Sequence, residues 1–155
     1  MRALLLHLRP VELKDRSLSQ GLQQILQELQ GKLPMEVVWR LDDQIRLESG
    51  VEDHLFRIAQ ESISNTLRHA QAQKLEVYLN QTPDTIDLAI IDDGRGFQMD
   101  QVKQAGNYGL TNIQERVQSL GGDLAIQSQP GQGTRLLIRI PVIKSRMHRK
   151  GDNHD

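Results

Sequence analysis

Apolar residues recur at helical spacing in three segments of the chain. The first segment ends at Gly31 and the third at Gly121, because glycine commonly follows the last turn of a helix. The second and longest segment runs from Val51 to Ala70, and we predict one helix over it, with Ser62 and Thr66 also on its inward face. The apolar positions that define these helices are Leu22, Ile25, Leu26 and Leu29, then Val51, Leu55, Ile58, Ile63 and Leu67, then Leu110, Ile113, Val117 and Leu120.

Alternating or continuous apolar runs predict strands between and after these helices. They cover residues 35–41, 75–79, 85–91, 124–128 and 134–142, and short turns join the second to the third and the fourth to the fifth. Hairpins outnumber strand–helix–strand crossovers, which argues against a doubly wound fold. We therefore predict an α/β two-layer sandwich, with a mixed, mostly antiparallel sheet of about five strands covered on one face by about three helices.

Composition narrows the class of protein. The chain has 155 residues, 37% of them hydrophobic and only 3% aromatic, so we expect one domain with a core of Leu, Ile, Val and Ala. A net charge of −1 gives no reason to expect a nucleic-acid partner. The absence of cysteine excludes disulfides and thiolate metal sites. No apolar run reaches the length of a membrane span and no signal peptide is recognisable, which suits a cytoplasmic domain.

The predicted strand 85–91 runs directly into Asp92, Asp93, Gly94 and Gly96. Two adjacent carboxylates cannot continue a dry strand, because burying an unpaired charge costs several kcal/mol or more. Glycine allows a tight bend and close approach of a flat ligand to the backbone. Two interpretations stay open at this point, a ligand pocket at the strand end and an ordinary Asp-Gly turn.

A row of polar residues follows the longest helix at intervals of four, at Glu61, Asn65 and His69. The row is either a solvated surface or a functional site beside the apolar face. Asparagine is a poor residue for a helix interior, but its side-chain oxygen is a suitable Mg²⁺ ligand. A glutamate one turn earlier can orient an attacking group or a metal-bound water, and Arg68 and His69 can contact phosphate oxygens.

Four short motifs in this order resemble those of the GHKL ATPases, the superfamily of gyrase, Hsp90, histidine kinases and MutL. The segment from Glu61 through Asn65 to His69-Ala70 resembles the asparagine box, and Asp92–Phe97 resembles the first glycine box. Gly106–Leu110 and Gly131–Thr134 resemble the remaining glycine boxes. Residues 54–61 and 110–117 are further similar to sensor histidine kinases of the LiaS, VraS and NarX type. The resemblance implies the Bergerat ATPase fold.

The resemblance also implies a role for each motif. Asp92 would accept a hydrogen bond from the adenine amino group, with Thr134 supporting that contact. Asn65 would hold Mg²⁺ against the phosphates, with Glu61 assisting phosphoryl transfer and possible metal contact through water. The remaining implied nucleotide contacts are Arg68 and His69 near the phosphates, Gly94 and Gly96 beside the base and lid, and Gly106, Gly109 and Leu110 in the lid and the start of the next helix.

One position departs from the family pattern, because Asp93 stands where many members have asparagine. Its charge would either weaken nucleotide binding or point away from the site. The Leu8-Arg9-Pro10 stretch matches the family's join between dimerisation helices and the ATP-binding domain. We therefore expect residues 1–10 to be a truncated dimerisation helix and linker, 11–143 the catalytic domain, and 144–155 a flexible tail.

The resemblance implies a protein-histidine kinase that uses Mg-ATP and passes the γ-phosphoryl group to a histidine of a dimerisation domain, then to an aspartate of a response regulator. Because that histidine lies upstream of the Leu8-Arg9-Pro10 join in the family, His7 is not expected to be the acceptor. The chain alone should bind ATP without autophosphorylation. The whole protein is expected to be a homodimer attached to the cell membrane. A stand-alone anti-sigma-type serine kinase and an interaction module that binds no nucleotide remain the alternatives.

Overall fold

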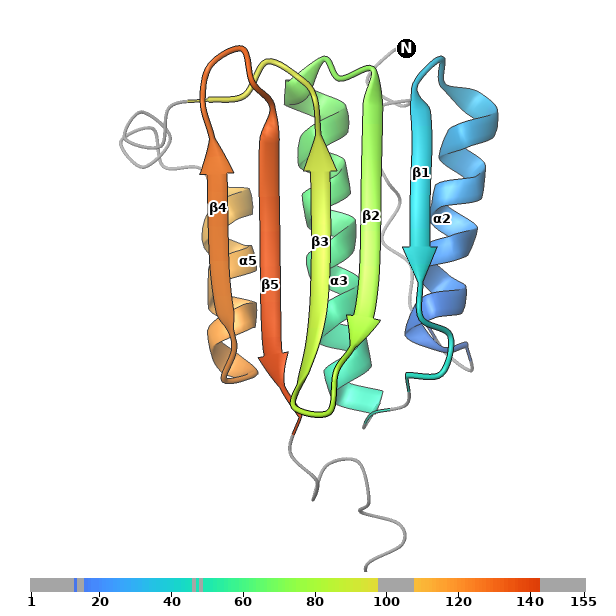
Figure 1. Ribbon diagram of the computed structural model, residues 1–155, viewed down its shortest axis with the longest axis vertical. Helices are drawn as coiled ribbons and strands as arrows, with labels where there is room; N and C mark the ends of the chain where they lie inside the picture. The colour runs from blue at the N-terminus through green and yellow to red at the C-terminus, as the bar shows by residue number, and fades with distance from the viewer. Residues whose placement is uncertain (1–12, 14–15, 46, 48, 98–107, 143–155) are drawn as a thin grey trace, which may run out of the picture.

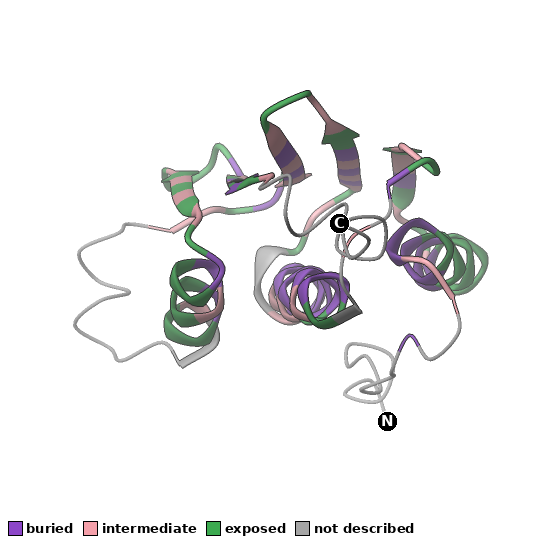
Figure 2. Cartoon of the chain, turned by 90° about the horizontal axis from the view of Figure 1, so that it is seen from below, coloured by how far each residue is buried: buried purple, intermediate pink, exposed green. Residues whose placement is uncertain are grey.

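The computed structural model describes residue 13 and residues 16–45, 47, 49–97 and 108–142 (Figure 1). These residues form a five-stranded sheet with three α-helices on one face (Figure 2), which confirms the predicted two-layer fold. The expected linker at 1–10 and tail at 144–155 lie outside the described residues. The elements are α2 (Leu18–Lys32), β1 (Glu36–Leu41), α3 (Ser49–Asn65), the π-helical turn η1 (Thr66–Ala70), β2 (Lys74–Gln81), β3 (Thr85–Asp92), α5 (Tyr108–Ser119), β4 (Asp123–Ser128) and β5 (Thr134–Pro141).

The sheet is mixed, in the order β1-β2-β3-β5-β4. β1 and β2 are parallel and are connected through α3, whereas the other three pairs are antiparallel. α3 and α5 run roughly along the strand direction, so that the end of α3 and the start of α5 lie toward the edge of the sheet where β3 ends (Figure 1). This edge therefore gathers the segments that carry the predicted motifs.

Helix α2 begins with a capping box, which explains its sharp start. The Ser17 hydroxyl accepts a hydrogen bond from the Gln20 backbone N–H at 3.2 Å, and the Gln20 side chain accepts one from the Ser17 N–H at 2.9 Å. The buried Glu52 of α3 adds a second connection, because its two carboxylate oxygens accept from the backbone N–H groups of Leu18 and Leu47, each at 2.8 Å. One carboxylate thus links the starts of α2 and α3.

The core lies between the sheet and the helices and consists mostly of leucine, isoleucine and valine. Because successive side chains of a strand point to opposite faces, Ile86, Leu88 and Ile90 of β3 all point toward the helices and are buried. Asp92 is the next residue in this alternation and is buried as well. In the described part of the chain, no helix is long and apolar enough to cross a membrane.

The prediction of one uniform helix from Val51 to Ala70 is wrong in its last turn. The α-helical hydrogen-bonding pattern of α3 ends at Asn65, and η1 continues as a π-helical turn. Gln71 then has a left-handed backbone with φ of 53°, which stops the helix. Turns of this type are frequent at functional sites, because they displace side chains from their regular helical positions.

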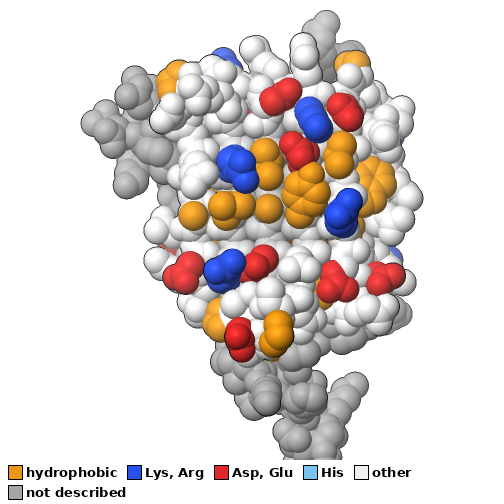
Figure 3. Space-filling view, viewed as in Figure 1, with side chains coloured by type: hydrophobic (Ala, Val, Ile, Leu, Met, Phe, Trp, Pro, Cys, Tyr) orange, Lys and Arg blue, Asp and Glu red, His pale blue; other side chains and the backbone are white. Residues whose placement is uncertain are grey.

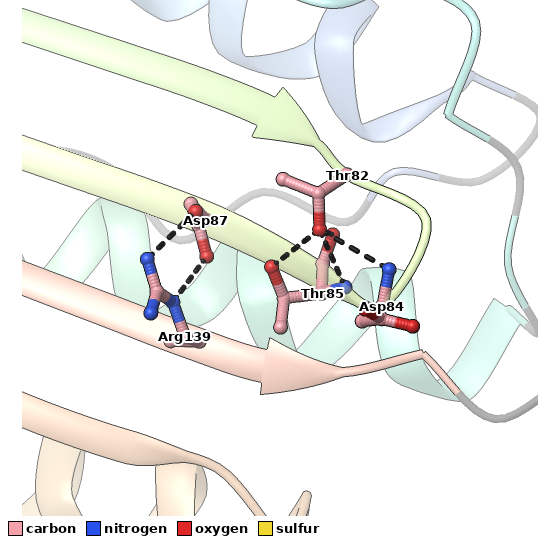
Figure 4. A network of polar contacts seen from close by, with 5 residues as sticks. All are labelled: Thr82, Asp84, Thr85, Asp87 and Arg139. Atoms are coloured by element: carbon pink, nitrogen blue, oxygen red, sulfur yellow. Dashed lines mark hydrogen bonds and ion pairs between the residues drawn. The ribbon is translucent and has the colours of Figure 1, made fainter.

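The opposite face of the sheet carries a band of apolar side chains (Figure 3), where the strand register sets Tyr78, Ala89, Leu137 and Ala125 side by side. Below it, Arg139 pairs with Asp87 across β5 and β3, with nitrogen–oxygen distances of 2.9 and 3.2 Å (Figure 4). In the β2–β3 turn, the Thr82 hydroxyl accepts from the backbone N–H groups of residues 84 and 85. These contacts stabilise the end of the sheet remote from Asp92.

Candidate functional site

Asp92 is the buried acid at the end of β3. Its Oδ1 accepts a hydrogen bond of 2.8 Å from the Gly94 N–H, and its Oδ2 accepts one of 3.1 Å from the Thr66 hydroxyl. Burial raises the pKa of the Asp92 carboxyl above its ordinary value, and the neighbouring charge of Asp93 raises it further. The hydrogen bonds from Gly94, Thr66 and the Thr134 backbone act in the opposite direction without cancelling the effect of burial.

The contact with Thr66 joins the strand end to the predicted polar row of the helix. Thr66 is the first residue of η1 and directly follows Asn65. The sequence placed Thr66 on the inward face, but its bond to a residue 26 positions away in the chain was not predicted. Asn65 and Asp92 therefore lie at the same end of the molecule, as the predicted site requires.

Two residues of the polar row, Glu61 and Asn65, contact the guanidinium of Arg68. Arg68 Nη2 donates to Asn65 Oδ1 at 3.0 Å and lies 3.7 Å from Glu61 Oε2, while its other terminal nitrogen donates to Ser64 Oγ at 2.5 Å. The side chains of Arg68 and Glu61 are 29% and 35% exposed, so incoming groups can reach them. The side chain of His69, the third member of the predicted row, is not among those that the structure describes.

The oxygen atoms of Asn65 and Glu61 suit a Mg²⁺ ion whose other ligands come from phosphate and water. The amide oxygen of Asn65 and the carboxylate of Glu61 already face one positive group, and hard oxygen atoms are the ligands that Mg²⁺ prefers. Among the described residues, there is no group of three or more histidine or acidic side chains that could hold a metal ion. A metal at Asn65 and Glu61 would therefore need further ligands from phosphate or water.

The two glycine-containing loops at this edge pack backbone against backbone. Gly96 has φ of +65°, and a Cβ atom there would lie 2.1 Å from the carbonyl oxygen of Gln129. Gly133 has φ of +78°, and a Cβ atom would lie 2.2 Å from the carbonyl oxygen of Asp92. At Gly96, this packing is a requirement beyond the tight bend and the close ligand approach that the sequence predicts. Gly94 is buried and contributes its N–H to Asp92.

Ser128 is a residue at this edge that the sequence argument missed. Its hydroxyl accepts from the Phe97 N–H at 2.9 Å, donates to the Gly133 carbonyl at 3.1 Å and lies 2.8 Å from the Thr134 hydroxyl. Ser128 and Thr134 are directly paired in the β4–β5 register. The sequence did contain a signal for this contact, because Ser128 and Thr134 are hydroxyl residues on either side of a predicted hairpin turn. Ser128 connects the loop after Asp92 to the strand that carries Thr134.

Asp93 points to a different part of the molecule from Asp92. Its Oδ1 accepts from the backbone N–H groups of Gln73 and Lys74, both at 2.9 Å, at the start of β2. The sequence left two alternatives for Asp93, that its charge weakens nucleotide binding or that it points away from the site. The contacts favour the second, because the carboxylate binds the backbone at the start of β2.

The second glycine box is described only in part. Gly106 lies outside the described residues, whereas Gly109 and the half-buried Leu110 are in the first turn of α5. Arg116 of α5 lies 3.3 Å from the His54 ring of α3, which connects these two helices. That contact lies toward the end of the two helices remote from Asp92, whereas the N-terminus of α5 lies toward the end of the sheet where β3 ends (Figure 1).

Comparison with known proteins agrees with these motifs. Residues 50–144 match the family model described as histidine kinase-, DNA gyrase B- and HSP90-like ATPase. The chain belongs to this ATPase family. The matched region contains the asparagine box, Asp92 and Thr134, and the resemblance drawn from the four motifs is confirmed.

Curated relatives of this ATPase family align over nearly the whole chain. The sensor histidine kinase LiaS of Bacillus subtilis is 44% identical over 99% of this chain, and the sensor protein VraS of Staphylococcus aureus (strain COL) is 47% identical over 93%. The chain spans 41% of the length of each of these relatives. It therefore corresponds to less than half of such a sensor protein.

Solved structures agree on the fold. The histidine kinase domain of the blue-light activated histidine kinase from Erythrobacter litoralis EL346 superposes with a TM-score of 0.72, at 22% identity, over 84% of this chain and 67% of its own. The ATP binding domain of PrrB from Mycobacterium tuberculosis gives a TM-score of 0.64, at 20% identity, over 82% and 95%. These similarities support the same arrangement of sheet and helices.

Proposed function

We propose that this chain is the catalytic and ATP-binding domain of a two-component sensor histidine kinase. The observation that carries the proposal is the Thr66–Asp92 hydrogen bond, because it brings the end of β3 next to Asn65. An acid suited to a purine amino group and an amide suited to a metal thus lie at one edge of the fold. Membership of the ATPase family and the 44% identity to LiaS support the same conclusion.

In this proposal, Asp92 recognises adenine. An ionised carboxylate only accepts hydrogen bonds. The adenine 6-amino group is a hydrogen-bond donor, whereas guanine presents a carbonyl oxygen, an acceptor, at the same place. Burial of Asp92 removes competing water, so the contact discriminates between these bases more strongly than an exposed one. Thr134, whose backbone bonds to Asp92, supports this end of the nucleotide.

The phosphates lie toward the polar row of α3 and η1. Asn65 would hold Mg²⁺ there, and the bound cation would supply positive charge against the negative charge that develops during transfer. Positive or N–H groups for the phosphate oxygens come from Arg68, from His69, from Gly106 and from the first turn of α5, which contains Gly109 and Leu110. Because phosphoryl transfer needs mainly positioning and electrostatic stabilisation, this arrangement suits the reaction.

Glu61 is the proposed catalytic residue. An imidazole nitrogen of a histidine on the dimerisation domain attacks the γ-phosphorus, the bond to the bridging oxygen breaks, and ADP leaves with that electron pair. Glu61 orients the imidazole or accepts its proton. The phosphoryl group then passes to an aspartate of a response regulator. In the whole protein, a homodimer attached to the cell membrane, this domain faces the cytoplasm.

Nucleotide titration of the chain tests the proposal. A ligand at 100 times its Kd stabilises the folded state by about 2.7 kcal/mol, so Mg-ATP should raise the melting temperature and Mg-GTP should have much less effect. Asp92→Asn should remove this preference. The absence of any shift with Mg-ATP would contradict nucleotide binding and favour an interaction module.

Addition of a dimerisation domain from a relative tests the phosphoryl transfer. It should produce a phosphohistidine on that domain, whereas phosphoserine on a protein substrate would favour the anti-sigma-type kinase.

A further inference from the structure

We propose that Thr66 is a positioning residue that sets the preference for adenine by orienting the Asp92 carboxylate; the inference rests on the proposed nucleotide function. Both residues are 7% exposed. The Thr66 hydroxyl donates to Asp92 Oδ2 at 3.1 Å, while the Gly94 N–H donates to Oδ1 at 2.8 Å. The carboxylate is thus held through both oxygen atoms, from the helix layer and from its own loop.

The acceptor sites of the carboxylate show what this second contact does. An ionised carboxylate has about four lone-pair sites. The Gly94 N–H, the Thr66 hydroxyl and the Thr134 backbone occupy three of them. About one site is left for a ligand. Without the hydroxyl, Oδ2 has a spare site and the carboxylate can rotate about its χ2 torsion, which is intrinsically soft.

The hydroxyl of Ser62 in α3 shows the contact that a buried helical hydroxyl usually makes, and Thr66 makes a different one. A buried serine or threonine in a helix commonly donates to the carbonyl four residues earlier, and Ser62 does so, to the Ile58 carbonyl at 2.8 Å. Thr66 lies one helical turn later, at the start of η1, and donates across the interface to the strand instead. Its β-branched side chain has few χ1 rotamers, which helps to hold the hydroxyl in this direction.

The test compares Mg-ADP with the Mg complex of purine riboside diphosphate, which lacks the 6-amino group. Thr66→Val removes the hydroxyl with little change in shape. We expect ADP affinity to fall about tenfold, because a hydrogen bond to a charged group is lost, and the affinity for purine riboside diphosphate to stay within about twofold. Thr66→Ser should restore the preference, since serine retains the hydroxyl. Calorimetric titration of the 155-residue chain measures both affinities.

Ser62→Ala is the matched control, because it removes a buried hydroxyl from the same helix without touching Asp92. It should leave the ratio of the two affinities unchanged. If Thr66→Val does not fold, Thr66→Ala provides the second variant, with the same expected loss of preference. Equal weakening of both nucleotides, or an unchanged ratio, would overturn the positioning role. Failure of the wild-type chain to bind either nucleotide would instead overturn the proposed function.

Discussion

The guanidinium of Arg68 donates a hydrogen bond of 3.0 Å to the amide oxygen of Asn65. The proposed metal ligand therefore faces a positive group of the protein itself. Mg²⁺ takes oxygen ligands, so the metal and the guanidinium would compete for the same amide oxygen, and we expect Arg68 to release Asn65 when Mg-nucleotide binds. Arg68 is then available to the phosphate oxygens one turn along the helix.

Asn65→Ala should abolish the Mg²⁺ dependence of ADP binding, because the variant lacks the amide oxygen. In the wild-type chain, affinity with Mg²⁺ should exceed affinity in EDTA by about tenfold or more, because even the loss of a residue that only supports a metal ligand costs about 10- to 100-fold in metal affinity. In the variant the two affinities should agree. Asn80→Ala is the control, since Asn80 is an exposed residue near the far end of β2. A variant at Asn65 that keeps the full Mg²⁺ effect would show that this residue is not the ligand.

The raised pKa of Asp92 predicts opposite effects of pH on stability and binding. Burial is the main cause of the shift, so the folded protein binds this proton more tightly than the unfolded chain, whose pKa is about 4. The stability contributed by the protonated carboxyl is present below about pH 4 and is lost as the pH rises through the raised pKa. ADP affinity should instead rise over this range, because the ionised carboxylate accepts the amino group.

Urea unfolding of the wild type and of Asp92→Asn across this pH range measures the first effect, since asparagine does not titrate. The wild type should lose stability relative to the variant as the pH rises. A difference that does not change with pH, or that changes in favour of the wild type, would contradict the burial argument. ADP titrations over the same range measure the second effect.

Gly96→Ala should destabilise the fold by about 2 kcal/mol or more, because the new Cβ would clash with a backbone carbonyl and the left-handed φ disfavours any side chain. Gly31→Ala is the control. No atom lies within 4 Å of the added methyl group there, and alanine is the better helix residue by up to about 1 kcal/mol. Equal unfolding free energies for the two variants would show that the packing of residues 94–97 against the β4–β5 turn is loose.

Asp93→Asn should leave Mg-ADP affinity within about twofold of wild type, because the Asp93 carboxylate contacts the backbone before β2 and not the Thr66–Asp92 pair. Asp93→Ala should also bind normally but unfold more easily, by about 1–2 kcal/mol, since two backbone N–H groups lose their acceptor. Tighter ADP binding by both variants would show that the charge opposes the nucleotide.

Much of the fold could be predicted because the relevant signals are local. The β2–β3 and β4–β5 hairpins follow from short turns between alternating strands. The turn η1 could not be predicted, because Thr66 to Ala70 continue the apolar spacing of an α-helix. Periodicity identifies which residues face inward and does not identify the hydrogen-bonding pattern that carries them.

By itself, the sequence determined the order of helices and strands, the two-layer fold and the family, because periodicity, turn chemistry and motif order are properties of neighbouring residues. The sequence predicts that the buried strand ends before the two acids, whereas the structure extends the alternation of β3 by one step and buries Asp92. Only the tertiary structure decided which partner each polar group takes: Thr66 for Asp92, Arg68 for Asn65, and the β2 backbone for Asp93. Such pairings depend on how the helix layer sits on the sheet and on which rotamers that packing allows.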